Sequence, residues 1–126
     1  MPPLTEREFT RQVRDLAQLF GWARYHTWLS KHSSAGFPDE VLVRAPRIVF
    51  AELKADAGKV SAAQAEWLDQ LAGCPAVEVC LWRPDMIDSI ALYLQHQQRP
   101  AIGPGWWLTP EQRAIRAVDA GLWSEP

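Results

Sequence analysis

The sequence predicts an α/β domain built on one mixed β-sheet. Segments with helical periodicity and segments rich in β-branched and aromatic residues follow in the order helix, three strands, helix, strand, helix, helix. A tight turn at Ala45-Pro46 joins the second and third strands, which predicts an antiparallel pair. A helix separates the third strand from the fourth, and such a crossover predicts a parallel pair.

The first half of the chain predicts one helix and three strands. Thr5 and Glu8 have the spacing of a capping box, and the apolar residues that follow recur at helical spacing up to Gly21. A helix is therefore expected over 6–20. The strands are expected over 22–29, 40–44 and 47–54.

The second half predicts three helices and one strand. Ser61 and Gln64 form a second capping-box pattern, and Thr109 and Pro110 are typical of a helix start. The helices are expected over 61–72, 84–97 and 109–120, and the strand over 77–83. Residues 99–107 contain two Pro and two Gly and are expected to be a linker.

Composition indicates one water-soluble domain. The chain has 126 residues, of which 48% are hydrophobic and 22% charged. No apolar run approaches the ~18 residues of a membrane helix, and no signal peptide is apparent, so the cytoplasm is expected and a membrane partner is not. Cys74 and Cys80 lack the neighbours of a zinc site and are expected to be free thiols.

Charge is distributed unevenly along the chain, although the net charge is only −2. Residues 1–60 carry nine Lys and Arg against seven Asp and Glu (+2), whereas residues 61–126 carry four against eight (−4). A nucleic-acid partner would therefore contact the first half.

Three charged residues at strand ends form the most informative pattern: Asp39, Glu52 and Lys54. Glu52 and Lys54 are two residues apart in a strand, so they share a face. If 40–44 and 47–54 pair through their turn, Asp39 lies beside both at the open end of the hairpin. Apolar residues surround Glu52, where an unpaired charge would be costly.

Two carboxylates in this setting are typical of a site for a hard divalent cation. Mg²⁺ and Mn²⁺ take oxygen ligands, often one or two carboxylates with water and substrate phosphate, and such an ion stabilises charge that develops on phosphate. Lys54 would add electrostatic stabilisation. The spacing also fits a turn residue followed by a surface ion pair, so the pattern alone leaves both interpretations open.

Three longer motifs together resemble one nuclease family. They are Gly36-Phe37-Pro38-Asp39, Phe50-Ala51-Glu52-Leu53-Lys54 and the run from Gly58 to Leu68 (GKVSAAQAEWL). The chain resembles, over about 5–94, the small stand-alone phage and bacterial VRR-Nuc nucleases of the PD-(D/E)xK superfamily. The resemblance implies a restriction-endonuclease-like core, which is expected in residues 1–98. Residues 99–126 lie beyond the resemblance and are expected to form an extension packed on the core or exchanged with it.

The resemblance also implies an activity and a set of site residues. The activity is Mg²⁺- or Mn²⁺-dependent cleavage of DNA, often branched DNA such as Holliday junctions, by a homodimer without a small-molecule cofactor. Asp39, Glu52 and the carbonyl of Leu53 would hold the metal, and Lys54 would be the catalytic lysine. Gln64 matches a glutamine near the active site, and its alternative is a plain capping residue.

The superfamily also places a glutamate on the first helix. Glu6 shares the face of Phe9 and Val13, whereas Glu8 points away from it, so Glu6 is favoured and Glu8 stays possible.

Four residues are candidate nucleic-acid contacts, and each has a plainer alternative. His26 would contact phosphate or shuttle a proton, or would be a core histidine. Arg11 belongs to a basic stripe with Arg7 and Arg14 that would follow phosphates or be a solvated face. Ser34 and Lys59 lie in expected loops, where they would contact the DNA backbone or solvent.

Two other functions compete with a DNA nuclease. One is a non-catalytic nucleic-acid-binding or assembly module on the same fold, suggested by the acidic, Trp-rich end of the chain. The complete Asp39, Glu52 and Lys54 set argues against it. The other is cleavage of RNA, because the same chemistry serves either backbone.

Overall fold

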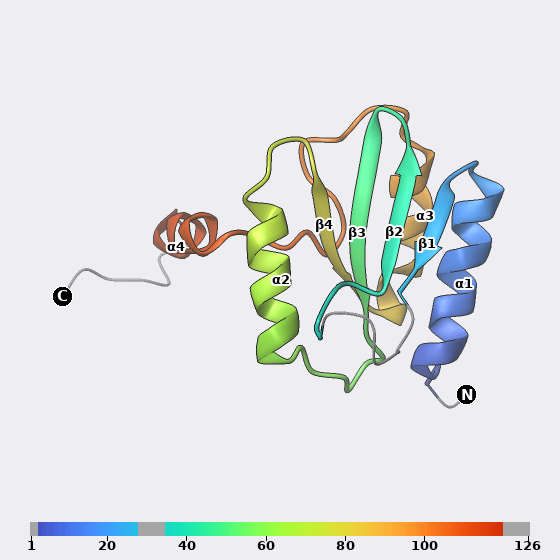
Figure 1. Ribbon diagram of the computed structural model, residues 1–126, viewed down its shortest axis with the longest axis horizontal. Coiled ribbons are helices and arrows are strands. Elements are labelled where there is room, and N and C mark those ends of the chain that lie inside the picture. The colour runs from blue at the N-terminus through green and yellow to red at the C-terminus, as the bar shows by residue number, and fades with distance from the viewer. Residues whose placement is uncertain (1–2, 28–34, 120–126) are drawn as a thin grey trace.

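A four-stranded mixed sheet with helices on both faces forms the body of the protein in a computed structural model, which describes residues 3–27 and 35–119 (Figure 1). The strands are β1 (Ala23–His26), β2 (Glu40–Arg44), β3 (Arg47–Leu53) and β4 (Glu78–Trp82), in the spatial order β1-β2-β3-β4. The helices are α1 (Glu6–Leu19), α2 (Ala62–Ala72), α3 (Ile87–Gln95), preceded by the 3-10 turn Pro84–Met86, and α4 (Pro110–Asp119). The β1–β2 and β2–β3 pairs are antiparallel and the β3–β4 pair is parallel, which confirms the mixed α/β sheet.

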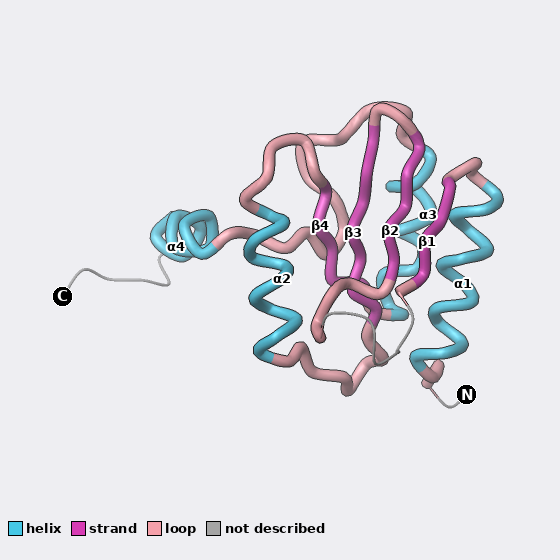
Figure 2. The backbone as a smooth tube through the Cα atoms, viewed as in Figure 1, coloured by secondary structure: helices cyan, strands magenta, loops and turns pink. Residues whose placement is uncertain are grey.

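The sheet lies between two layers of helices, so the body has three layers. Helix α2 covers one face, α1 and α3 lie against the other, and α4 projects away from the body (Figures 1 and 2). The main core lies between the sheet and the α1–α3 layer. Its fully buried members include Phe9, Val13, Leu42, Val49 and Ile90.

Helix α1 forms as its cap and apolar spacing predict. The Thr5 hydroxyl accepts a hydrogen bond from the Glu8 amide at 3.1 Å, which satisfies one of the free N–H groups of the first turn. Phe9, Val13 and Ala17 recur every four residues and are buried. The helix thereby presents one apolar side to the sheet and the other, charged side to solvent.

Several boundaries differ from the sequence-based expectations. The first strand is Ala23–His26, shorter than 22–29, and residues 28 and 29 lie outside the described part of the chain. Helix α3 ends at Gln95, not at 97, because His96 leaves the helix with extended backbone (φ −65°, ψ 133°).

The expected linker contacts the sheet directly. Within it, residues 103–107 run along the outer edge of β4. The Leu81 amide donates to Gly105 O at 2.7 Å and the Trp107 amide donates to Val79 O at 2.7 Å. Gly105 has φ +65°, and a Cβ there would lie 2.1 Å from Leu81 O, so only glycine fits. The segment therefore covers the edge of the sheet. The contact is made by backbone hydrogen bonds, which do not depend on side-chain identity and are therefore hard to predict from the sequence.

A buried ion pair holds the end of the sheet where β3 and β4 begin. Arg47 donates to both carboxylate oxygens of Glu78, at 3.0 and 2.7 Å, and both residues are 1% exposed. The Tyr93 hydroxyl also donates to Glu78. Burial raises the pKa of Tyr93, so the phenol keeps its proton for this hydrogen bond. This end of the sheet is thus locked by charge-assisted hydrogen bonds.

None of the helices in the described residues has the length and apolar character needed to cross a membrane.

Candidate functional site

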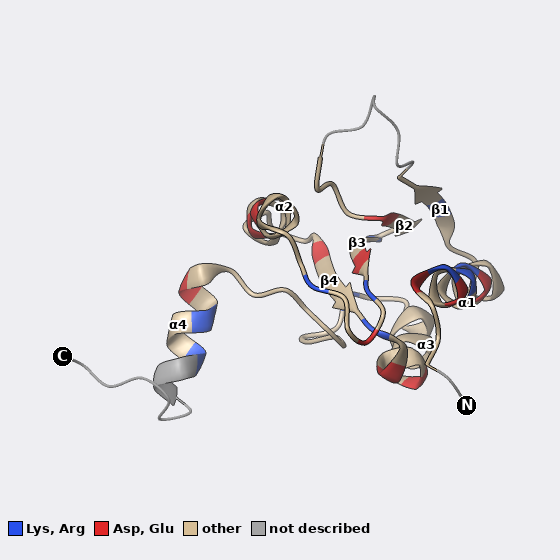
Figure 3. Cartoon of the chain, turned by 90° about the horizontal axis from the view of Figure 1, so that it is seen from below, with Lys and Arg blue, Asp and Glu red and all other residues tan. Residues whose placement is uncertain are grey.

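The β2–β3 hairpin brings Asp39 and Glu52 to the same end of the sheet. Asp39 directly precedes β2, and its Oδ2 accepts a hydrogen bond from the Leu53 amide at 2.9 Å. Its own carbonyl accepts from the Thr27 amide at 2.8 Å. Seen from below, acidic positions mark the start of β2 and the end of β3, and a basic position follows β3 (Figure 3). The hairpin therefore brings Asp39 next to Glu52, as predicted, and Glu52 in turn lies 3.6 Å from Lys54.

The turn before Asp39 is held against α2. Gly36 has φ +86°, and a Cβ on it would lie 2.5 Å from the backbone carbon of Ala63, so the turn needs glycine. The Phe37 ring packs edge-on against Phe50 and Trp67, with centroid distances of 6.1 and 5.1 Å. These contacts explain why glycine and an aromatic residue precede the aspartate.

Glu52 is a buried carboxylate with one unsatisfied oxygen. Its side chain is 1% exposed, and Oε1 lies 2.8 Å from Gln64 Nε2 and 3.6 Å from Lys54 Nζ. Oε2 is buried and has no hydrogen-bond partner among the described residues. Burial, and next the negative charge of Asp39, raise the pKa of Glu52 from 4.5 to about 8.

Gln64 performs two tasks with its two amide atoms. Its Oε1 accepts from the Ser61 amide at 2.9 Å, which completes the capping box of α2. Its Nε2 donates to Glu52 Oε1. The capping and active-site interpretations of Gln64 are therefore compatible, because each uses a different atom.

Lys54 stands at the exit of β3, beside a loop that is held in place. Its side chain is 14% exposed. A Cβ added to Gly58 would lie 3.3 Å from Lys54 Cδ, so the loop passes close to the aliphatic part of this side chain. The Arg83 guanidinium donates to the carbonyls of Ala55, at 2.9 Å, and Gly58, at 2.7 Å. The sequence did not point to Arg83, whose contacts fix the loop beside Lys54.

The two carboxylates fit a hard divalent cation. Glu52 Oε2 has no partner although burial makes that costly, and a cation beside it would also relieve the repulsion from Asp39. Within the described ranges no cluster of three or more His, Cys, Asp or Glu side chains could hold a metal. This donor set therefore suits Mg²⁺ or Mn²⁺, which keep several waters, better than an ion that needs a full protein cage.

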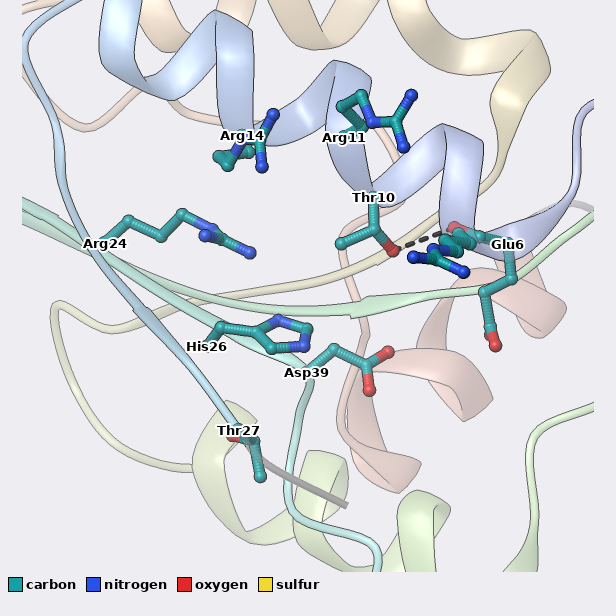
Figure 4. A pocket seen from close by; sticks show the side chains of 9 residues that line it. Glu6, Thr10, Arg11, Arg14, Arg24, His26, Thr27 and Asp39 are labelled. Atoms are coloured by element: carbon teal, nitrogen blue, oxygen red, sulfur yellow. Dashed lines mark hydrogen bonds between the residues drawn. The ribbon is translucent and has the colours of Figure 1, made fainter.

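An open pocket of about 400 Å³ adjoins Asp39, between α1 and β1 (Figure 4). Of the sequence candidates, Glu6, Arg11 and His26 line it together with Asp39, whereas Glu8 and Lys59 do not. Glu6 is exposed and projects from the first turn of α1. Ser34 lies outside the described residues, and Lys59 is exposed in its loop.

Two residues of this pocket region were not found from the sequence. Arg24 on β1 lines the pocket, and Glu40 lies fully buried behind it. Glu40 shares a strand face with Leu42, which is a core residue. That alternation marks Glu40 as an inward-facing charge, and this signal was available.

Comparisons with known proteins identify the family and the fold. The VRR-NUC domain family profile matches residues 3–84. One solved structure, described as a VRR-NUC domain protein, superposes with a TM-score of 0.57 and 23% identity, covering 82% of this chain and 99% of its own. At this identity the structural match concerns the fold alone. No match was found among curated proteins.

Proposed function

The chain belongs to the VRR-NUC domain family, a family of nucleases, and from this premise we propose that it is a metal-dependent endonuclease that hydrolyses DNA phosphodiesters. The observation that carries the proposal is the buried, unpartnered Oε2 of Glu52 next to Asp39. An ordinary structural carboxylate would have its hydrogen bonds satisfied by the protein. This one faces a second carboxylate, as a cation ligand would.

Each residue has a distinct role in the proposed reaction. Asp39 and Glu52 would hold Mg²⁺ or Mn²⁺ with the Leu53 carbonyl, and the ion would supply Lewis-acid stabilisation of charge on the phosphate. The Leu53 amide orients Asp39, and Gln64 orients Glu52. Lys54, held 3.6 Å from Glu52, would donate to the negative charge that develops at the reacting phosphate.

Branched DNA, and Holliday junctions in particular, is the proposed preferred substrate. This part of the proposal is supported by the resemblance to the stand-alone VRR-Nuc nucleases. Resolution of a junction requires cuts in two opposed strands. A second copy of the chain in a homodimer would provide the second active site.

The test is cleavage of a labelled four-way junction, a flap and a linear duplex of matched sequence, each with Mg²⁺, Mn²⁺ or EDTA. Wild-type protein is compared with Glu52→Gln and with Glu66→Gln, which removes an exposed carboxylate from α2. Calorimetry of Mn²⁺ binding reports on the metal site independently of cleavage. We expect metal-dependent cutting and Mn²⁺ binding in wild type and Glu66→Gln, and neither in Glu52→Gln.

Three results would change the conclusion. Cutting in EDTA, or full activity of Glu52→Gln, would refute the metal mechanism. Equal cutting of all three substrates would keep the nuclease and remove the preference for junctions. DNA binding without any cutting would favour a non-catalytic module, and cutting of matched RNA alone would make the chain a ribonuclease.

A further inference from the structure

Four arginines surround the pocket beside Asp39. Arg7, Arg11 and Arg14 come from successive turns of α1, and Arg24 faces them from β1 (Figure 4). His26 adds a fifth nitrogen-bearing side chain. The carboxylates in the lining are those of Glu6 and Asp39, so positive charge predominates.

The stripe on α1 makes one ion pair within the described residues, between Arg14 and Asp15. Arg7 and Arg11 are four residues apart, a spacing at which like charges destabilise a helix by a few tenths of a kcal/mol. Arg14 is in contact with Asp15 at 3.3 Å in an exposed pair, which contributes little. A ligand that carries negative charge would offset the repulsion.

A buried carboxylate holds Arg24 and His26 at the pocket wall. Glu40 is 0% exposed, and it accepts from Arg24 Nε at 2.8 Å and from Arg24 Nη2 at 2.7 Å. Its Oε1 also lies 2.9 Å from His26 Nδ1. The two side chains are 25% and 40% exposed, so Glu40 fixes the guanidinium and the imidazole while part of each side chain stays open to solvent.

The clamp leaves Arg24 with donors to spare. A guanidinium has five N–H groups, and Glu40 engages two of them, one on Nε and one on Nη2. Nη1 has no hydrogen-bond partner in the described part of the chain. A planar guanidinium fixed along one edge presents its other edge in the geometry that suits a phosphate oxygen pair.

We propose that this pocket binds the DNA backbone at phosphates adjacent to the one that is cut, with Arg24 as a direct phosphate ligand and Glu40 as its positioning residue. The inference rests on the proposed nuclease function, because the pocket shares Asp39 with the metal site. Arg7 to Arg14 spans about 10 Å along the helix axis, against about 3.4 Å of rise per nucleotide in B-DNA. The stripe therefore reaches more than one phosphate.

The test is DNA binding in EDTA, where cleavage is absent, measured by fluorescence anisotropy of a labelled junction over a range of salt concentrations. The variants are Arg24→Gln and, as a matched control, Arg116→Gln, which removes an exposed arginine from α4. We expect Arg24→Gln to weaken binding about tenfold and to reduce the slope of log K against log salt by about 0.9, the value for one phosphate contact. Arg116→Gln should leave both unchanged.

Two charge-conserving variants test the positioning role of Glu40. Glu40→Asp withdraws the carboxylate by one methylene, and Arg24→Lys removes the two-point contact. If Glu40 positions Arg24, both should weaken binding severalfold although net charge is unchanged, in protein that unfolds at the wild-type temperature. Should Glu40→Asp lose stability, Arg24→Lys alone carries this comparison.

Wild-type affinity and slope in Arg24→Gln would overturn the proposal. This result differs from failure of the nuclease function. Absence of cleavage with the expected loss in Arg24→Gln would leave the pocket standing, whereas metal-dependent cleavage with an unchanged slope would overturn the pocket alone.

Discussion

The buried Glu52 carboxyl makes the stability of the metal-free protein depend on pH. Its pKa is raised from 4.5 to about 8, first by burial and then by Asp39, while Lys54 acts in the opposite direction. The folded protein therefore holds a proton that the unfolded chain releases near pH 4.5. Between these values the folded state binds more protons, so the free energy of unfolding falls as pH rises.

The size of this effect follows from the shift. At about 1.36 kcal/mol per pKa unit, a rise from 4.5 to about 8 corresponds to a loss of about 5 kcal/mol by pH 8.5. Solvent relaxation makes this an upper bound. It is still comparable with the 5–15 kcal/mol of total stability typical of a domain.

The assay is urea unfolding at pH 5 and pH 8.5 in EDTA. Wild type and the control Glu66→Gln should lose several kcal/mol between the two pH values, and Glu52→Gln should lose much less because it has no charge to bury. At pH 8.5, Mg²⁺ should restore stability to wild type and not to Glu52→Gln, because a ligand stabilises the state that binds it. An equal pH dependence in Glu52→Gln would refute the reasoning.

Three further outcomes are expected. Glu6→Gln should lower turnover at least tenfold while Glu8→Gln leaves it unchanged, because Glu6 lines the pocket with Asp39; steady-state kinetics decide, and equal effects would exclude a specific role for Glu6. Gln64→Ala should cost about 1 kcal/mol through the lost cap and weaken Mn²⁺ binding ten- to a hundredfold, as measured by urea unfolding and calorimetry; unchanged Mn²⁺ affinity would separate Gln64 from the metal site. Arg47→Met should cost about 3–5 kcal/mol in urea unfolding by leaving Glu78 charged and unpaired, with normal activity per folded molecule; a stability loss below 1 kcal/mol would contradict this account of the ion pair.

The hairpin and its carboxylates could be predicted because their signals are local. The strand Glu40–Arg44 agrees with the expected range, and a two-residue turn leaves one way to bring Asp39 to Glu52. The capping box of α2 is likewise a four-residue pattern. Each of these features depends on residues that are close in sequence.

The basic pocket could be predicted only in part. The stripe on α1 is visible as a pattern, but its partner Arg24 lies on a short strand that follows a turn. Only the pairing of β1 with β2 places Arg24 and His26 over Glu40. The spacing of charged residues along the sequence does not show which of them come into contact between neighbouring strands.

The segment 103–107 has a consequence for how far the folding unit extends. The family match ends at residue 84, yet the outer edge of β4 obtains its hydrogen bonds from Gly105 and Trp107. A protein that ended after α3, at Gln95, would keep the core layer but expose that edge, with the Val79 carbonyl and the Leu81 amide unpaired, to any neighbouring chain, and such edges recruit further strands. Shortened forms are therefore expected to self-associate, and the smallest piece suited to transplantation into another protein reaches at least to Trp107.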